Sequence, residues 1–348
     1  MTRCRVTRLA SVPSVVHDLA MLRSRFTELF GLDYPLMSAP MALHSGGTLA
    51  GAVSAAGGLG SFGGVHPSGD PNWIRSEVAK IRERTGRPFA IGFITDFIPF
   101  VEPLFEASLS EAPALIALSF GDPEPWIERC KEAGSSVICQ VQTYAHADLA
   151  VEAGADALVA QGTEAGGHTG EMSLLPLLAG VSAQHPQIPV LAAGGVGDGR
   201  TLAAAMMAGA DGAWLGTAFL ATPEAMEIDD VHKRLIVESD GADTVYTHAY
   251  DIVSGYPWPP GIGERVRRNR FTDEWADREA ELRTKREEVA ASRSGLSGIS
   301  EEDVATREVL YGQSARFVTA VRPVAEVMRS ICDEAERQLR SRPQSFLR

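Results

Sequence analysis

The sequence predicts an α/β protein, a (β/α)8 or TIM barrel followed by a C-terminal helical extension. Short apolar runs alternate with amphipathic stretches eight times between residues 35 and 225, which is typical of parallel strands joined by crossover helices. Glycines lie in the turns between these segments rather than in long linkers. Eight such units favour a closed barrel over an open sheet, because closure leaves no hydrophobic edge strand exposed.

The expected elements follow this alternation in order. Strands are expected at residues 35–41, 59–63, 89–94, 114–120, 136–141, 157–161, 189–194 and 213–219. Helices are expected at residues 48–56, 71–85, 100–110, 124–133, 144–153, 173–184, 199–208 and 224–238. Glycines that follow several of the helices are expected to cap them in a left-handed conformation, at Gly57, Gly86, Gly134, Gly154 and Gly209.

An open Rossmann-type sheet is the alternative fold. It needs a GxGxxG fingerprint after the first strand, and the sequence there reads MALHSGG. We therefore assign residues 21–240 to the barrel and expect residues 1–20 to form a disordered N-terminal segment. Residues 241–348 are expected to form a loop and helical extension that packs on the barrel and contributes to its site.

The expected extension begins with a proline-rich loop, YPWPPG, at residues 256–261. A strongly charged helix at residues 271–295 follows, with a solvated face or a dimer contact as its default role. A further helical segment is expected at residues 302–340.

Composition and charge exclude several classes of protein. Hydrophobic residues make up 45% of the chain and charged residues 22%, which is enough apolar mass for a large core. The net charge of −13 argues against a nucleic-acid surface, which needs a basic stripe. No apolar run is long enough to cross a membrane. We therefore expect a cytoplasmic protein, monomeric or homodimeric, that acts on a small molecule.

The cysteines show no metal-binding or redox pattern. Cys4, Cys130, Cys139 and Cys332 are scattered along the chain, with no CxxC pair and no zinc-like spacing to histidine. We expect free thiols and no metal site.

Two glycine motifs follow the seventh and eighth expected strands, AGGVG at residues 193–197 and LGT at residues 215–217. In barrels the backbone N–H groups of these two loops converge on a phosphate, and glycine lets the main chain approach the anion. The candidate phosphate ligands are Gly194, Gly195, Gly216 and Thr217. A phosphosugar, pyridoxal phosphate and FMN all fit such a corner, and tight turns alone would also explain the glycines.

A histidine follows the sixth expected strand in the loop QGTEAGGHTG, residues 161–170. A loop so rich in glycine can lie flat against a planar ligand, and His168 then projects from the catalytic end of the barrel. Imidazole can accept and hold a proton at neutral pH, so we predict that His168 is a general base. Glu164 is expected to cap or to neutralise rather than to catalyse.

The first expected strand ends in SAPM, residues 38–41. Ala39 and Pro40 are small or compact enough to leave room for a ring system at the barrel mouth, with Met41 as a soft contact. Met37 is expected to fill the barrel core. Nothing in the sequence marks His44 or His66 for a role.

As a set, these motifs resemble the nitronate monooxygenases, formerly called 2-nitropropane dioxygenases. They keep the family's order from about residue 25 to residue 325. They are SAPM at 38–41, AGGLG at 56–60, QGTEAGGH at 161–168, AGGV at 193–196, LGT at 215–217 and GQS at 312–314. The EAGGH loop alone is shared with FMN-dependent enoyl-acyl-carrier-protein reductases and related quinone reductases.

The resemblance implies FMN across the barrel mouth and an oxidation of nitronates. The implied cofactor-binding residues are Ala39, Pro40, Met41, Gln161, Gly162, Gly166, Gly167, Gly194, Gly195, Gly216, Thr217, Gln313 and Ser314. His168 matches the family's catalytic histidine, which would take the proton from the carbon beside a nitro group or orient a preformed nitronate. Oxidation with O2 would then give a carbonyl compound and nitrite.

Two other functions stay open on the sequence. One is an FMN-dependent NAD(P)H reductase of the enoyl-acyl-carrier-protein or quinone type, because barrel flavoenzymes do not require the dinucleotide fingerprint that is absent here. The other is a non-redox phosphate-binding barrel enzyme, which would be colourless.

Overall fold

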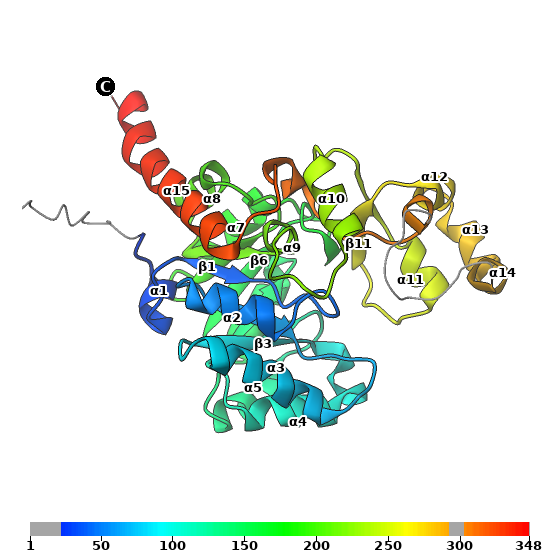
Figure 1. Ribbon diagram of the computed structural model, residues 1–348, viewed down its shortest axis with the longest axis horizontal. Coiled ribbons are helices and arrows are strands. Elements are labelled where there is room, and N and C mark those ends of the chain that lie inside the picture. The colour runs from blue at the N-terminus through cyan, green and yellow to red at the C-terminus, as the bar shows by residue number, and fades with distance from the viewer. Residues whose placement is uncertain (1–21, 292–302, 348) are drawn as a thin grey trace, which may run out of the picture.

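The computed structural model describes residues 22–291 and 303–347; the predicted N-terminal segment 1–20 lies outside these residues. Eight parallel strands form one sheet in the order β1-β9-β8-β6-β5-β4-β3-β2. Their bounds are β1 Leu36–Ser38, β2 Gly60–Gly63, β3 Phe89–Ile94, β4 Leu115–Ser119, β5 Ser136–Val141, β6 Ala157–Gln161, β8 Val190–Ala193 and β9 Gly212–Leu215. A bridge between Met37 and Leu59 joins β1 to β2. The sheet is therefore closed, and the predicted (β/α)8 barrel is confirmed (Figure 1).

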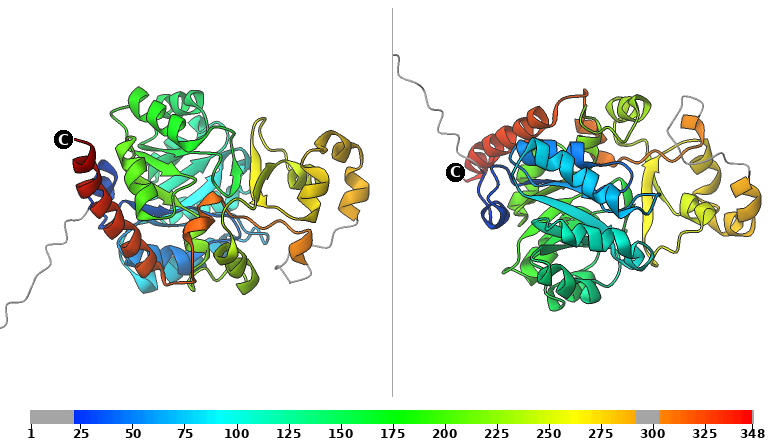
Figure 2. Two further views of the ribbon diagram at one scale, coloured as in Figure 1. Left: turned by 90° about the horizontal axis from the view of Figure 1, so that it is seen from above. Right: turned by 60° about the horizontal axis from the view of Figure 1, so that its bottom comes forward.

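Helices surround the strands on the outside (Figure 2). Their bounds are α2 Gly47–Ala55, α3 Pro71–Arg84, η1 Thr95–Phe100, α4 Glu102–Ser110, α5 Glu124–Glu132, α6 Tyr144–Glu152, α7 Leu174–Gln184, α8 Gly199–Met207, α9 Thr217–Leu220 and α10 Asp230–Glu238. Their apolar faces pack on the outward side chains of the strands to form the main core. A second core fills the barrel interior, and Met37 belongs to it as predicted.

Three expected boundaries were wrong by three residues or more. The first strand ends at Ser38, and the eighth ends at Leu215, where Gly216 turns the chain into the short helix α9. Helix α10 begins only at Asp230, because Asp229 caps it by accepting a hydrogen bond from His232 N. Gly86 lacks the expected left-handed conformation, whereas the other expected capping glycines adopt it.

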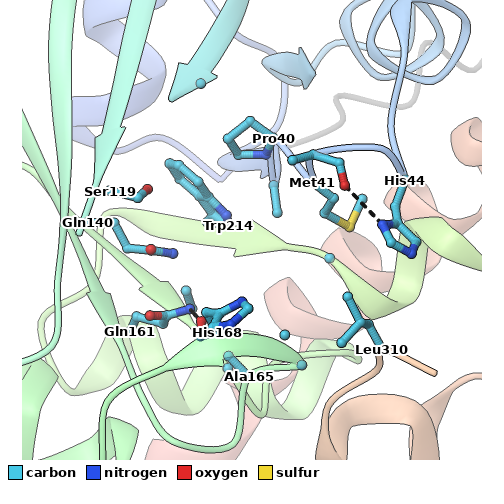
Figure 3. A pocket seen from close by; sticks show the side chains of 18 of the residues that line it. Pro40, Met41, His44, Ser119, Gln140, Gln161, Ala165, His168, Trp214 and Leu310 are labelled. Carbon is cyan, nitrogen blue, oxygen red and sulfur yellow. Dashed lines mark hydrogen bonds between the residues drawn. The ribbon is translucent and has the colours of Figure 1, made fainter. Parts of the chain in front are cut away.

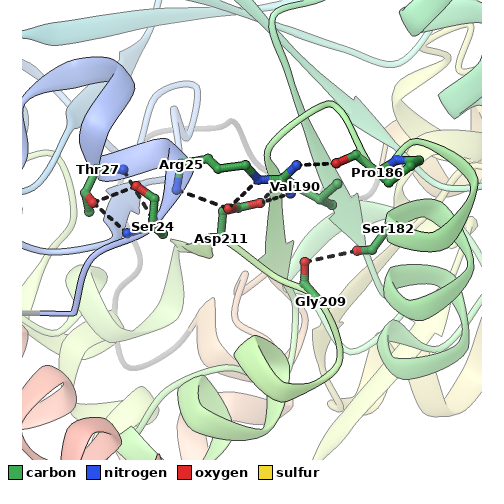
Figure 4. A network of polar contacts seen from close by, with 8 residues as sticks. All are labelled: Ser24, Arg25, Thr27, Ser182, Pro186, Val190, Gly209 and Asp211. Carbon is green, nitrogen blue, oxygen red and sulfur yellow. Dashed lines mark hydrogen bonds and ion pairs between the residues drawn. The ribbon is translucent and has the colours of Figure 1, made fainter.

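Helix α1, Arg25–Phe30, closes the amino-terminal end of the barrel. Its Phe26 side chain is fully buried among the inward-facing residues of the strands. Arg25 fixes the helix through Asp211, whose carboxylate accepts hydrogen bonds from Arg25 Nε (2.9 Å) and from Val190 N (3.1 Å) (Figure 4). Aromatic burial and this ion pair therefore close the amino-terminal end of the barrel.

A three-stranded antiparallel sheet in the order β10-β11-β7 lies at the carboxyl end of the barrel. Its strands are β7 Gly167–Thr169, β10 Thr244–Thr247 and β11 Gly263–Arg267. None of them was expected from the sequence. In Figure 2, β11 stands between the barrel and a group of small helices that forms the far end of the molecule.

The prediction of a single charged helix at residues 271–295 was wrong for the described residues, which end at 291. The segment forms α12 Arg270–Trp275, α13 Glu279–Thr284 and α14 Arg286–Ala291. Its buried residues, which include Phe271, Trp275 and Leu282, pack around α11, Ala249–Ser254.

The expected helix 302–340 is also wrong in its first half. It contains η2 Asp303–Ala305, η3 Gln313–Phe317 and the long helix α15 Val324–Phe346. Pro323 cannot donate a helical hydrogen bond, so α15 begins after it, and Gly312 is extended (φ −98°, ψ −179°). Helix α15 returns along the outside of the barrel and packs on α8 (Figure 1).

The described residues contain no helix that is both long and apolar enough to span a membrane. The described cysteines Cys130, Cys139 and Cys332 are free and buried. Burial raises the pKa of the Cys130 and Cys139 thiols to about 12, so these thiols are poor nucleophiles at neutral pH.

Candidate functional site

A pocket opens at the carboxyl ends of the barrel strands, the end of this fold where ligands bind. Its volume is about 1180 Å³, counting the space that opens to solvent. The walls come from the strand ends and β7, and the extension adds Trp258, Leu310, Tyr311 and Ser314. Figure 3 shows Ser119, Gln140 and Gln161 on one side of the pocket and Met41, His44 and Leu310 on the other.

The structure brings most of the predicted site residues together in this pocket. Those that line it are Ala39, Pro40, Met41, Gln161, Gly166, Gly167, His168, Gly194, Gly216, Thr217 and Ser314. Gly162, Gly195 and Gln313 do not line it. The Gly162 carbonyl accepts hydrogen bonds from Ala165 N and the Thr169 hydroxyl, and so shapes the loop. Gln313 donates its backbone N–H to Glu164 O, while its side chain is exposed.

The glycine corner has the properties of an anion site. Gly194 and Gly195 have left-handed φ values of 90° and 70°, which turn the chain sharply at the end of β8. Among the described residues, the backbone N–H groups of Gly195, Gly216 and Thr217 have no hydrogen-bond acceptor. The Thr217 hydroxyl accepts a hydrogen bond from Gly312 N at 3.0 Å, which ties the corner to the extension. Free N–H groups on glycine-rich turns are suited to bind phosphate oxygens.

The loop that carries His168 is fixed by local hydrogen bonds. Glu164 accepts a hydrogen bond from Leu174 N at 3.0 Å, at the start of α7; the expected capping role is confirmed. Gln161 donates from Nε2 to His168 O at 2.9 Å, and Gln142 donates to Gln161 Oε1 at 2.9 Å. His168 also pairs with Glu264 across the β7–β11 ladder. The histidine thus lies on a strand rather than in a free loop.

The imidazole of His168 has two neighbours from the extension. Its Nε2 lies 2.9 Å from Asp251 Oδ1, and the two side chains are 19% and 12% exposed. Its ring stacks on the Trp258 indole, with 3.6 Å between centroids and 16° between planes. From the sequence, no role was assigned to Asp251, and Trp258 was placed only within the proline-rich loop at residues 256–261.

The outer wall of the pocket is aromatic. The Trp258 ring contacts Phe97 and Phe120, and Phe93 lines the pocket nearby. Phe120 has a left-handed φ of 61°, a conformation that costs a non-glycine residue about 1–3 kcal/mol and that is found at binding sites. Among the described lining residues there is no Lys, Arg, Asp or Glu.

Two polar side chains that the sequence did not single out also line the pocket, Ser119 and Gln140. Gln140 Oε1 is buried and has no hydrogen-bond partner among the described residues. Because a buried acceptor without a partner costs free energy, Gln140 is suited to receive an N–H donor from a ligand. His44 lines the pocket and bonds to Ala42 O (2.9 Å), whereas His66 lies outside it beside Ser68.

Comparisons with known proteins point to one family. The family model for nitronate monooxygenase matches residues 23–99 and 97–334. A "probable nitronate monooxygenase" from Staphylococcus saprophyticus is 32% identical over 303 residues, covering 74% of this chain and 83% of that protein. A "(3aS,4S,5R,7aS)-5-hydroxy-7a-methyl-1-oxo-octahydro-1H-indene-4-carboxyl-CoA dehydrogenase" from Mycobacterium tuberculosis is 34% identical over 232 residues, covering 66% of this chain but only 64% of that protein.

Solved structures are similar over nearly the whole chain. FabK from Thermotoga maritima has a TM-score of 0.82 and 32% identity, covering 93% of this chain and 100% of that one. A nitroalkane oxidase from Streptomyces ansochromogenes has a TM-score of 0.71 and 28% identity, covering 91% of this chain and 99% of that one.

Proposed function

This chain belongs to the nitronate monooxygenase family, and from that premise we propose that it is an FMN-dependent enzyme. It oxidises alkyl nitronates, and nitroalkanes after loss of a proton, with O2 to carbonyl compounds and nitrite. One observation carries the proposal: a single pocket is lined both by Gly194, Gly216 and Thr217 of the glycine corner and by His168. The names of the staphylococcal relative and of the nitroalkane oxidase support this substrate class.

The residues present fit FMN. The free N–H groups of Gly195, Gly216 and Thr217 suit its phosphate without a cationic side chain. Gln140 Oε1 suits an N–H at a polar ring edge. When bound, FMN would supply the oxidation and the reaction with O2, while the protein supplies binding and the base.

His168 would remove the proton from the substrate carbon next to the nitro group. For a neutral nitroalkane, the C–H bond next to the nitro group breaks, the proton passes to the imidazole, and the electron pair stays on the substrate as a nitronate. For a nitronate that is already ionised, His168 would only orient the anion. The aromatic wall of Phe93, Phe120 and Trp258 excludes water around the reacting carbon and favours an apolar substituent.

An NAD(P)H-dependent FMN reductase is the second candidate. The similarity to FabK, with a TM-score of 0.82, and the dehydrogenase among the relatives favour it. A reductase takes its electrons from a nicotinamide, whereas the proposed oxidase takes them from the nitronate.

Anaerobic reduction separates the two candidates. We expect purified protein to show flavin absorbance, and the flavin to bleach when a nitronate is added without O2 and to recover its colour with O2. Rapid bleaching by NADH or NADPH in the absence of any nitro compound would establish the reductase instead. A colourless protein that does not take up added FMN would overturn both.

His168→Asn tests the base. We expect it to retain FMN, to lose about 100-fold or more of kcat/KM on neutral nitroalkanes, and to lose much less on preformed nitronates. His66→Asn is the matched control, because the half-buried His66 lies outside the pocket. An equal loss on both substrates would show that His168 does not act as a base.

A further inference from the structure

We infer that Asp251 is a positioning residue that fixes the tautomer of His168 with its proton on Nε2, so that the Nδ1 lone pair is the one available to the substrate. The inference rests on the proposed role of His168 as a base and names a residue that acts through it. Asp251 does not line the pocket, and its effect on the reaction would be exerted through the imidazole.

The hydrogen bond sets the tautomer. Asp251 Oδ1 lies 2.9 Å from His168 Nε2, and an ionised carboxylate can only accept, so Nε2 carries the proton. Nδ1 of His168 has no hydrogen-bond partner among the described residues. In the neutral ring Nδ1 is then the unprotonated nitrogen, and it belongs to a side chain that lines the pocket.

The helix that carries Asp251 is anchored by buried neighbours. It lies on α11, where its neighbours Tyr250 and Ile252 are buried in the small core of the extension. Asp251 Oδ2 is buried and has no hydrogen-bond partner among the described residues. Because leaving a buried carboxylate oxygen unsatisfied is costly, a carboxylate placed here for stability alone would be expected to have further donors.

Trp258 restricts the remaining freedom of the ring. Its indole lies parallel to the imidazole at 3.6 Å, while Asp251 holds one edge and Gln161 holds the His168 backbone. Rotation of the ring by 180° about the Cβ–Cγ bond would put Cε1 in the place of Nε2, and the hydrogen bond to Asp251 would be lost. The bond to Asp251 and the stack together favour one orientation.

As a consequence, His168 Nδ1 is already unprotonated and oriented to act as a base. When Nδ1 takes the proton from the carbon of a nitroalkane, the ring becomes an imidazolium with protons on both nitrogens, and the nearby carboxylate stabilises that charge. The C–H electron pair stays on the nitronate, so no other reactant is needed for this step. A nitronate supplied already ionised bypasses the step.

Asp251→Asn tests the inference with a matched control. The amide is similar in size but uncharged, and it can accept from Nε2–H or donate to Nε2, so it no longer fixes one tautomer. Glu279→Gln is the control, because Glu279 lies on α13 of the same extension and pairs with His248 Nδ1 at 3.2 Å, away from the pocket. Asp251→Glu keeps the charge and should restore part of the activity.

The expected kinetic result is selective. Asp251→Asn should lower kcat/KM on a neutral nitroalkane by about 10- to 100-fold and should increase the deuterium isotope effect on that substrate. It should change kcat/KM on the preformed nitronate by less than about threefold. FMN affinity and Tm should match those of Glu279→Gln. Equal losses on the two substrates would overturn the inference.

A spectroscopic measurement is independent of turnover. In protein labelled with 15N-histidine, the His168 signals, assigned by their loss in His168→Asn, should show a protonated Nε2 and an unprotonated Nδ1 at neutral pH. In Asp251→Asn they should move toward a mixture of tautomers. If His168→Asn loses nitroalkane turnover while Asp251→Asn changes neither signals nor rates, the base assignment stands and the role of Asp251 fails. If His168→Asn has no selective effect, the proposed role of His168 as a base fails, and the inference about Asp251 fails with it.

Discussion

The main chain at Gly166 packs directly on the main chain at Gly312. A Cβ on Gly166 would lie 2.4 Å from Gly312 N, and a Cβ on Gly312 would lie 2.5 Å from Glu164 O. The histidine loop and the segment before η3 therefore meet at a distance that only glycine permits. This contact couples the extension to the loop that carries His168.

Gly166→Ala should separate these two segments. We expect a loss of FMN affinity and a destabilisation of about 1–3 kcal/mol from overpacking, measured by flavin fluorescence titration and urea unfolding. Gly86→Ala is the control, because a Cβ there meets nothing within 4 Å and should leave both measurements almost unchanged. Unaltered FMN binding in Gly166→Ala would contradict the coupling.

We expect Thr217 to contribute to binding of the FMN phosphate rather than of the flavin ring. Thr217→Val removes the acceptor of Gly312 N and leaves a buried donor unsatisfied, at a cost of about 1–3 kcal/mol. We expect a clear loss of affinity for FMN and little loss for riboflavin, which lacks the phosphate, while Thr217→Ser keeps both. An equal loss of affinity for FMN and for riboflavin would show that the phosphate does not bind at this corner.

His232 should make the fold less stable in mild acid. Burial, and then the neighbouring His44, lower the pKa of His232 from 6.5 to about 4, against smaller opposing effects of Leu310 O and Asp229. In the unfolded chain His232 binds a proton below about pH 6.5, whereas in the folded state it does so only near pH 4. The free energy of unfolding therefore decreases as the pH falls from about 6.5 toward 4. Its contribution between pH 7 and pH 4.5 should be about 2–3 kcal/mol.

His232→Gln isolates this contribution, because glutamine can still donate to Leu310 O in place of His232 Nε2 but does not titrate. The pH dependence of the unfolding free energy should be flatter than in the wild-type protein by the amount stated. His66→Gln, at a half-buried position outside the core, should keep the wild-type slope. An unchanged slope in His232→Gln would show that other groups cause the acid sensitivity.

The Arg25–Asp211 pair should contribute to stability and not to catalysis. Asp211 is 9% exposed and Arg25 42% exposed, so the loss on Asp211→Ala should be about 2 kcal/mol, below that of a fully buried pair. Asp273→Ala breaks the exposed pair with Arg268 and should cost less than about 1 kcal/mol. Urea unfolding measures both; a fall in kcat of folded Asp211→Ala protein would contradict the assignment.

The barrel could be predicted from the sequence because each strand is buried and several of the surrounding helices are amphipathic, so the local pattern of apolar residues indicates the element type. The strands β7, β10 and β11 could not. β7 carries glycine and histidine, and β11 has one apolar side chain, Val266, among three charged residues. Their pairing depends on contacts between distant segments. The apolar residues of the segment 271–295 repeat at helical spacing, so the local pattern could not show that its described part breaks into three helices.

The residues of the site also fall into those that the sequence could predict and those that it could not. The glycine corner and His168 belong to short motifs at strand ends, where the barrel itself dictates the location. Asp251 and Trp258 reach His168 only through the fold of the extension, and each is an ordinary residue in its local sequence. Gln140 was hidden because its role depends on the absence of a partner for Oε1, which only three-dimensional structure reveals.

The packing of Phe26 into the amino-terminal end of the barrel has a consequence for the order of events in turnover. Within the part of the chain that the structure describes, the pocket lies at the opposite end, where Trp258 and Phe120 are among the residues that line it. A ligand in the pocket has no second exit through the end that Phe26 closes, so its release has to precede the binding of the next one.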